Sequence, residues 1–600
     1  PLSLSPYSLL LFSPTAIPPP HCPPIAPTSP PSFIAAMIDI PELHNMICAH
    51  LDQADLARCA RVSKKWHALV TPFLWSSFRC VEVSSNTARW QAFARLVLDD
   101  YLHEQRHHQS TQEFHTIDRP IHPPTPSPSL PPLAKYGHCI KFLPHPSTIV
   151  KCLQLIDDPS PSQQPPEQQA LQKPTPYDLM RHLYTRCPLH QHYRIISLCD
   201  NDLKEDECVK IIGEYVVPGL RGLIVLRTDD RYLESWKIKY LLKHCASTLE
   251  YLSIEMDNIP YNEELDEMHQ VVQQPESMPL LKWLALAKLD NSSEAFLSWL
   301  WERCSQVELL ELSGLNNLPG SLVDSLPIHM PNLNSIHLIE LSLSDEKIAA
   351  LLSITRNGWK DIRMAYFNGL HLRRTHRALM EHCLTLEELE IHNCAINGVQ
   401  KAQILAASPN LHTFCTLEDD WFKGDSYFDV HSFIDRDPQT GELKTWACES
   451  TLKTLKVKIT GVPILGSHGV RGWGMGGSEV VREAYPGQAR EIQGHVYDRL
   501  ARLTHLETLW LAQENRVDRL ECLDMSLDSG LHKLAGLKEL KELGIEHLKT
   551  RIGVQEVQWM VNQWPKLRTI LGLKSQRTEE AKEAVEWLQK HHPEICLSQW

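Results

Sequence analysis

Two short motifs in the sequence carry residue types that catalysis requires, and the first has the spacing of a zinc site. His103, Glu104 and His107 form the pattern H-E-x-x-H, which on a helix would place two imidazole ligands and a general-base carboxylate on one face. Arg106 introduces a charge into this motif, and the sequence that follows is polar and rich in proline, unlike a packed catalytic domain. We therefore expect no bound metal here, and we keep an H-E-x-x-H zinc metalloprotease only as an alternative.

The second motif is a set of glycines: Gly472, Gly474 and Gly477 fit the pattern G-x-G-x-x-G. A dinucleotide site needs these glycines at a tight turn from a strand into a helix, with an acidic residue about 20 positions later. Here they lie inside a long glycine-rich stretch, which predicts a flexible loop. Because P-loop and G-x-S-x-G signatures are also absent from the sequence, we expect no cofactor and no catalytic residue.

The overall composition limits the classes of partner. A formal net charge of -14 argues against a protein that binds nucleic acid by neutralising phosphates. The 17 cysteines include no C-x-x-C pair, which indicates reduced, mostly buried thiols in the cytoplasm and/or the nucleus. Because no stretch of about 18 apolar residues is present, we expect no transmembrane helix and no membrane partner.

An internal repeat indicates the element that would position functional side chains. The pattern apolar–x–x–apolar–x–apolar starts at Leu281, Val307, Leu333 and Trp359, at intervals of 26 residues. It starts again at Leu386, 27 residues after Trp359. Copies of the pattern also start at Leu220, Leu249, Leu411, Leu452, Leu506, Leu540 and Leu567. The last two apolar positions of each copy share one face of a short strand, and the helix-like stretches 293–304 and 376–383 would return the chain.

This period predicts a leucine-rich-repeat solenoid of the α/β class, a right-handed β/α horseshoe, in which stacked neighbours bury each other's apolar faces. A doubly wound α/β domain is the alternative, and the constant spacing argues against it. Residues 1–36 are expected to be a disordered Pro-rich leader, with Met37 as the expected start, because a basic region typical of a signal peptide is missing. The other predicted regions are a compact all-α domain at 37–80, a linking region with Pro-rich insertions at 81–190, the solenoid at 191–575 with insertions at 419–450 and 461–500, and a C-terminal capping helix at 576–600.

The compact block at 38–78 has apolar residues at helical spacing on two successive stripes. These residues are Leu43, Met46, Ile47 and Leu51 on the first stripe, and Leu56, Cys59, Val62, Trp66 and Leu69 on the second. About 40 residues make only a marginal core, so we expect this unit to dock on a partner.

This segment resembles an F-box. The likeness rests on Ile40-Pro41-Glu42-Leu43, Ile47, Leu51-Asp52, Asp55-Leu56, Arg61-Val62-Ser63-Lys64-Lys65-Trp66 and Leu74-Trp75. Ile40 and Ser63 stand where F-boxes often have Leu and Cys. With the repeats that follow, the chain resembles the F-box/LRR substrate-receptor family.

The resemblance implies a role and partners. An F-box docks on a Skp-type adaptor, which links it to a cullin–RING ubiquitin ligase, so the chain would be a non-catalytic receptor that recruits a protein client. Seven residues then become candidates for the adaptor interface or for its supporting core, two roles that the sequence does not separate: Pro41, Leu43, Ile47, Leu51, Leu56, Val62 and Trp66. A non-degradative F-box/LRR scaffold is the alternative function.

The client would bind the concave surface, which is formed by the residues between the apolar strand positions. The predicted surface residues are Trp283, Glu311, His337, Glu388, Glu390, His392, Lys456, Lys458, Thr508 and Trp510. Trp283 and Trp510 are expected to be interface anchors, unless an insertion loop covers either one. The acidic residues Glu388 and Glu390 point to a client with a basic patch.

Overall fold

The computed structural model describes the repeat region and the helices that precede it. The described residues are 58–59, 61, 70, 87–114, 146–154, 174–187, 195–199, 202–226, 234–255, 277–288, 294–316, 322–355, 357–367, 372–417, 427–463, 486–512, 523–545, 548, 551–576 and 578–598. The predicted leader at 1–36 and the glycine motif at 472–477 lie outside these residues.

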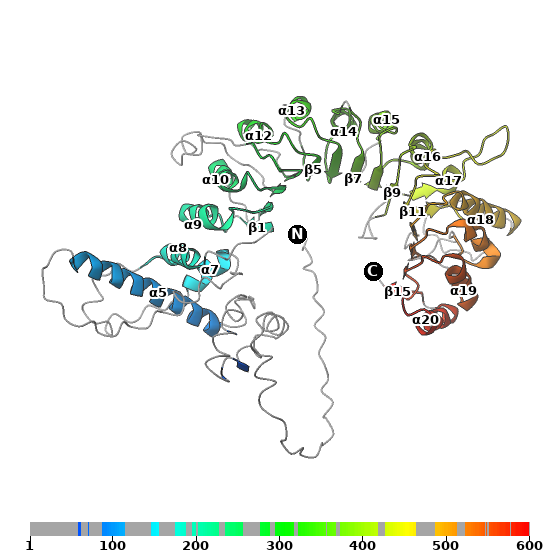
Figure 1. Ribbon diagram of the computed structural model, residues 1–600. Helices are drawn as coiled ribbons and strands as arrows, with labels where there is room; N and C mark the ends of the chain where they lie inside the picture. The colour runs from blue at the N-terminus through cyan, green and yellow to red at the C-terminus, as the bar shows by residue number, and fades with distance from the viewer. Residues whose placement is uncertain are drawn as a thin grey trace, which may run out of the picture.

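One long parallel sheet forms the inner wall of the described structure, and helices cover its outer side in an arc (Figure 1). Its strands are β1 Ile195–Cys199, β2 Gly222–Leu226, β3 Tyr251–Glu255, β4 Trp283–Ala287, β5 Leu309–Ser313, β6 Ser335–Ile339, β7 Asp361–Phe367, β8 Glu388–Cys394, β9 Thr413–Cys415, β10 Tyr427–Asp429, β11 Thr454–Thr460, β12 Thr508–Ala512, β13 Glu542–Gly544, β14 Thr569–Leu571 and β15 Cys596–Ser598. Neighbouring strands follow one another in the sequence, with β10 alone lying off this path against β11. This order confirms the predicted repeat horseshoe and excludes a doubly wound sheet, in which the strand order reverses.

The repeat motif fixes where each strand begins. In the repeats that start at Leu281, Val307 and Leu333, the strand begins two residues later. The second and fourth strand residues, such as Leu284 and Leu286, point toward the helices and are buried. A single apolar core built in this way runs along the described chain between the sheet and the helices.

A left-handed backbone residue follows the fifth strand position in five successive repeats. These residues are Lys288, Gly314, Glu340, Tyr366 and Asn393, with φ between 46° and 62°. The amides of Lys288, Gly314 and Glu340 each donate to the carbonyl of a residue on the next strand, which keeps the turns in register. Asn and Gly adopt this backbone conformation readily, whereas Lys288, Glu340 and Tyr366 adopt it at a cost in free energy.

The helices return the chain from one strand to the next, as the sequence predicted. They are α9 Asp206–Ile211, η5 Ile212–Val216, α10 Ser235–Cys245, α12 Glu294–Trp301, α13 Leu322–His329, α14 Asp345–Leu352, α15 Arg373–Glu381, α16 Gly398–Ala407, α17 Val430–Phe433, α18 Pro486–Ala501, η6 Leu527–Ser529, η7 Leu531–Gly536, α19 Val554–Gln563 and α20 Glu579–His591. Most of the described cysteines are buried, as predicted, and burial raises the pKa of the Cys245 thiol to about 12.

Three further helices lie in the predicted linking region and pack at the N-terminal end of the arc: α5 Thr87–Phe114, α7 Pro146–Gln154 and α8 Pro176–Arg186 (Figure 1). Buried Asp100 on α5 accepts a 2.8 Å hydrogen bond from His182 Nε2 on α8. It also forms a 3.1 Å ion pair with Arg186 Nε, on the same helix as His182. Glu104, from the H-E-x-x-H motif, lies 3.1 Å from His182 Nδ1 and 3.2 Å from Arg186 Nη2. Within the described chain, therefore, the Glu104 carboxylate joins α5 to α8, and no group of three potential ligands could hold a metal there.

Three predicted segments differ from the structure. Part of the insertion predicted at 419–450 is folded: β10 pairs with β11, and buried Lys401 of α16 donates a 2.8 Å hydrogen bond to the Tyr427 carbonyl. Similarly, α18 occupies the end of the insertion predicted at 461–500 and is the helix of its repeat. The C-terminal segment is not only a capping helix, because α20 is followed by β15, which pairs in parallel with β14.

Candidate protein-interaction surface

The inner face of the sheet presents three rows of side chains, which come from the first and third strand positions and, in the strands of five or seven residues, from the fifth position. We call them the edge row, the middle row and the distal row. The edge row runs through Ile195, Gly222, Tyr251, Trp283, Leu309, Ser335, Asp361, Glu388 and Thr413. The middle row contains Ala285, Glu311, His337, Arg363, Glu390, Cys415, Lys456 and Trp510, and the distal row contains His392 and Lys458.

The N-terminal part of the edge row is apolar and open to solvent. Trp283 is 39% exposed, and its ring lies 4.7 Å from that of Tyr251 on the neighbouring strand in an edge-to-face arrangement. Ile195 is 57% exposed and lies over Gly222, where a Cβ would come within 2.9 Å of the Ile195 side chain. The predicted exposure of Trp283 is therefore confirmed, and Trp283 lies in an apolar shelf that it forms with Tyr251 and, across Gly222, with Ile195.

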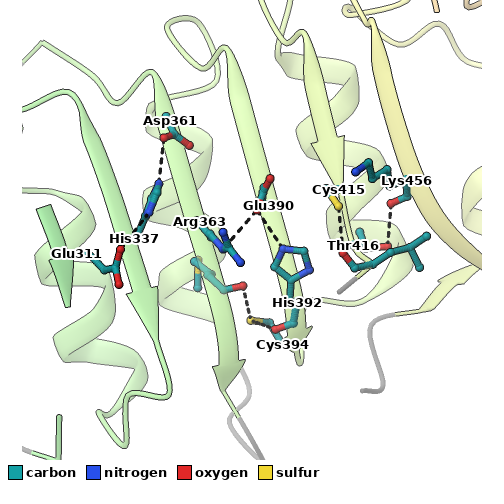
Figure 2. Close-up of polar contacts among 12 residues, drawn as sticks. Glu311, His337, Asp361, Arg363, Glu390, His392, Cys394, Cys415, Thr416 and Lys456 are labelled. Carbon is teal, nitrogen blue, oxygen red and sulfur yellow. Dashed lines mark hydrogen bonds and ion pairs between the residues drawn. The ribbon is translucent and has the colours of Figure 1, made fainter. Parts of the chain in front are cut away.

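A histidine between two carboxylates occupies the centre of the middle row (Figure 2). His337 Nε2 lies 3.1 Å from an Asp361 oxygen, and Nδ1 lies 3.8 Å from a Glu311 oxygen. Burial by itself would lower the pKa of His337, but the hydrogen bonds and charges of Asp361 and Glu311 outweigh it and raise the pKa to about 9. The imidazole is therefore a cation at neutral pH, and it neutralises part of the negative charge around it.

A second charged cluster, on β7 and β8, consists of Arg363, Glu390 and His392 (Figure 2). Glu390 lies 3.2 Å from His392 Nε2 and 3.3 Å from Arg363 Nε. The hydrogen bond from His392, followed by the charge of Arg363, lowers the pKa of Glu390 despite its burial. The pKa of Glu388 is raised, first by partial burial and then by the negative charges of Asp361, Glu390 and Glu387, and the charge of His412 opposes this rise.

Two of the cations near Glu388 are engaged with other carboxylates, and His412 acts on it only through its charge, without an ion pair in the described chain. Arg363 pairs with Glu390 and Lys360 pairs with Glu387, and no ion pair reaches Glu388 within the described part of the chain. Glu388 is thus an exposed carboxylate among other carboxylates, and its environment favours the approach of a cation.

Three of the predicted surface residues are buried, which corrects the sequence-based assignment. Trp510 is 8% exposed, because Lys456 Nζ lies 3.5 Å from its ring centroid and its back lies against Gly544 on β13. Its indole N–H also donates a 2.6 Å hydrogen bond to Glu542. Lys458 is 8% exposed and lies over the Tyr427 ring, and His392 is 3% exposed.

The predicted residues therefore fall into separate groups along the arc. Glu311 and His337 form one contact group, Glu390 and His392 form another, and Lys456 and Trp510 form a third. Thr508 and Glu388 are in the edge row. The sequence reasoning missed Ile195, Tyr251, Asp361, Arg363 and Glu542. Asp361 and Arg363 could have been found from the 26-residue period, which aligns them with Ser335 and His337.

Comparison with known proteins identifies the segment ahead of the solenoid. Residues 41–80 match the F-box-like family model. The chain thus carries an F-box-like domain ahead of a leucine-rich-repeat solenoid. The adaptor-contact candidates in the F-box-like domain, from Pro41 to Trp66, lie outside the described residues.

Two solved structures are similar to the chain at low identity. One is a chain of the crystal structure of the Rad7 and Elc1 complex in yeast, with 14% identity over 70% of this chain and 77% of that chain and a TM-score of 0.34. The other comes from the crystal structure of the TLR13–ssRNA13 complex, with 12% identity over 61% of this chain and 58% of that chain and a TM-score of 0.23. No curated protein matches the sequence. In the described part of the chain, every helix is too short or too polar to cross a membrane.

Proposed function

We propose that this chain is the substrate-recognition subunit of a Skp adaptor–cullin–F-box ubiquitin ligase and that its solenoid recruits the client. The observation that carries the proposal is the F-box-like match at residues 41–80, placed ahead of a solenoid whose inner face exposes aromatic and acidic side chains. An F-box module docks on a Skp-type adaptor, and an open array of repeats offers an extended surface for a protein partner.

The proposed mechanism requires no chemistry from this chain. Holding a client lysine close to a ubiquitin-charged enzyme raises the effective concentration of the two reactants. This benefit depends on a stiff connection between the adaptor and the client. The contacts of Asp100 and Glu104 with His182 and Arg186 support such a connection, because they fix α5, which follows the F-box-like domain, to the helix before the first strand.

Adaptor binding tests the first half of the proposal. The full chain is co-expressed with a Skp-type adaptor, and Leu43→Asp/Leu56→Asp is compared with the wild type. A few buried anchors dominate a small apolar interface, so the double variant should lose the adaptor. Leu384→Asp is the matched control, because Leu384 is an exposed leucine of the solenoid and its replacement should leave binding intact. Unchanged adaptor binding by a folded double variant would contradict the assignment.

The distinction between a ligase receptor and a scaffold needs a further measurement. Cullin should co-purify with the wild-type complex, and the lifetime of a bound client in cells should increase when Leu43 and Leu56 are replaced. A client whose lifetime is the same with both forms would favour the scaffold.

A further inference from the structure

We propose that the client segment is an extended peptide with an apolar or aromatic residue and, about six residues away, a lysine or arginine. This inference rests on the proposed function, because it names the chemistry of the client that the solenoid would bind. The supporting observation is that the edge row contains both the apolar shelf around Trp283 and the carboxylate of Glu388, which has no ion pair in the described chain.

The apolar contact would be the shelf of Ile195, Tyr251 and Trp283. A single exposed apolar side chain is ordinary, but here exposed Ile195 and Trp283 flank half-buried Tyr251 in the edge row, with Gly222 between Ile195 and Tyr251. The Tyr251 ring supports the Trp283 ring from one side, so the indole is held in place before binding. A rigid, partly exposed tryptophan loses little conformational entropy when an apolar side chain packs on it.

The basic contact would be Glu388, with Asp361 beside it in the same row. His337 is close enough to compensate Asp361, and Arg363 compensates Glu390, so that of these three carboxylates Glu388 is the one for which the described chain supplies no ion pair. A lysine or arginine of the client would supply the missing positive charge. Charge complementarity at this position therefore favours a basic peptide and disfavours nucleic acid, whose phosphates would be repelled.

The distance between the two contacts follows from the sheet. Trp283 on β4 and Glu388 on β8 occupy the same row, four strands apart. Neighbouring strands lie about 4.8 Å apart, so the two positions are separated by about 19 Å. An extended peptide advances about 3.3 Å per residue, and about six residues cover this distance. Three row positions lie between the contacts: Leu309 and Ser335 carry no charge, and Asp361 is paired with His337. The residues of the peptide that face Leu309 and Ser335 are therefore free to vary.

The test is a selection from a library of random displayed peptides on the full chain bound to its adaptor. The enriched peptides should share an aromatic or aliphatic residue and a lysine or arginine at a separation of about six residues, in either chain direction. Trp283→Ala should weaken their binding by about tenfold or more, as expected for a central anchor. Glu388→Gln should weaken it by about threefold, as expected for a partly exposed ion pair. Repeating the selection on Glu388→Lys should replace the basic residue with an acidic one.

Two substitutions on the outer helices serve as controls. Glu381→Gln on α15 removes an exposed carboxylate from the repeat that contains Glu388, and Val399→Ala on α16 truncates an exposed apolar side chain. Neither should change peptide binding. The inference is overturned if no peptides are enriched, if the enriched peptides lack a basic residue, or if binding survives Trp283→Ala and Glu388→Lys. Adaptor binding is measured on the same samples, so failure of the proposed function appears there and is distinguished from failure of this inference.

Discussion

The stability of the charged centre of the inner face depends on pH through His337. Replacing His337 with Gln removes the cation that lies between Asp361 and Glu311. The folded pKa of about 9 exceeds the ordinary value of 6.5, so folding favours the protonated imidazole. This difference of about 2.5 in pKa corresponds to about 3–4 kcal/mol, and partial exposure of the two carboxylates reduces the expected contribution to about 1–3 kcal/mol.

The stabilisation that His337 provides decreases as the pH rises, because its pKa is higher in the folded chain than in the unfolded chain. Below pH 6.5 both the folded and the unfolded chain hold the proton on His337, and the stabilisation is fully present. Between pH 6.5 and about 9 only the folded chain keeps the proton, so the contribution declines as the pH rises. Above the folded pKa the contribution is lost. The difference between the wild type and His337→Gln should therefore be largest near pH 6 and small near pH 10.

Hydrogen exchange measures this difference locally, which suits a repeat array whose unfolding need not be two-state. Peptides that cover β6 and β7 are compared at several pH values after correction for the intrinsic exchange rate. His431→Gln is the control, because His431 is exposed and lies outside the three inner rows. An equal difference between the wild type and His337→Gln at pH 6 and pH 10 would refute the account of His337 as a cation.

Two further substitutions test the packing that supports the surface. Lys401→Met should raise the free energy of local opening of α16 by about 1–4 kcal/mol near pH 7, as measured by hydrogen exchange. The reason is that burial lowers the pKa of Lys401 to about 7, so a charged lysine destabilises the folded chain. The gain should shrink toward pH 10, where the unfolded lysine also loses its proton; a loss of protection at pH 7 would contradict this reasoning. His182→Ala should cost about 1–3 kcal/mol, because buried Asp100 loses one hydrogen-bond donor and keeps its ion pair with Arg186, and it should raise exchange in α5. Equal protection of α5 in the variant and the wild type would show that the contact does not hold the helix.

The regular part of the fold could be predicted from the sequence because one spacing determines it. Constant intervals from Leu281 to Trp359 fix both the start of each strand and the register between strands, so Glu311, His337 and Arg363 become neighbours. β10 and β15 were missed because each has three residues and lacks the full motif. Similarly, the folded part of the first insertion includes Tyr427, whose carbonyl accepts a hydrogen bond from buried Lys401, and this contact joins the repeat to a segment outside the period.

Exposure was harder to predict than position. The alternation of a strand places Trp283 and Trp510 on the same face, but the neighbouring strands decide whether each is covered. Trp283 has Tyr251 on one side and stays open, whereas Trp510 lies between Lys456 and Gly544 and is closed. A glycine that lets a large ring lie flat on the sheet leaves no signal in the ring's own repeat. The pairing of Glu104 with α8 likewise required the packing of distant helices.

Ubiquitin transfer in a reconstituted ligase tests the central claim most directly. The full chain is assembled with its adaptor, cullin and charged conjugating enzyme, and a client bound to the inner face is followed for ubiquitin attachment. The wild type should modify the client, and Leu43→Asp/Leu56→Asp, which should still bind the client, should not. Equal modification with both forms, or an unmodified client in the complete wild-type assembly, would contradict the role of this chain as a ligase receptor.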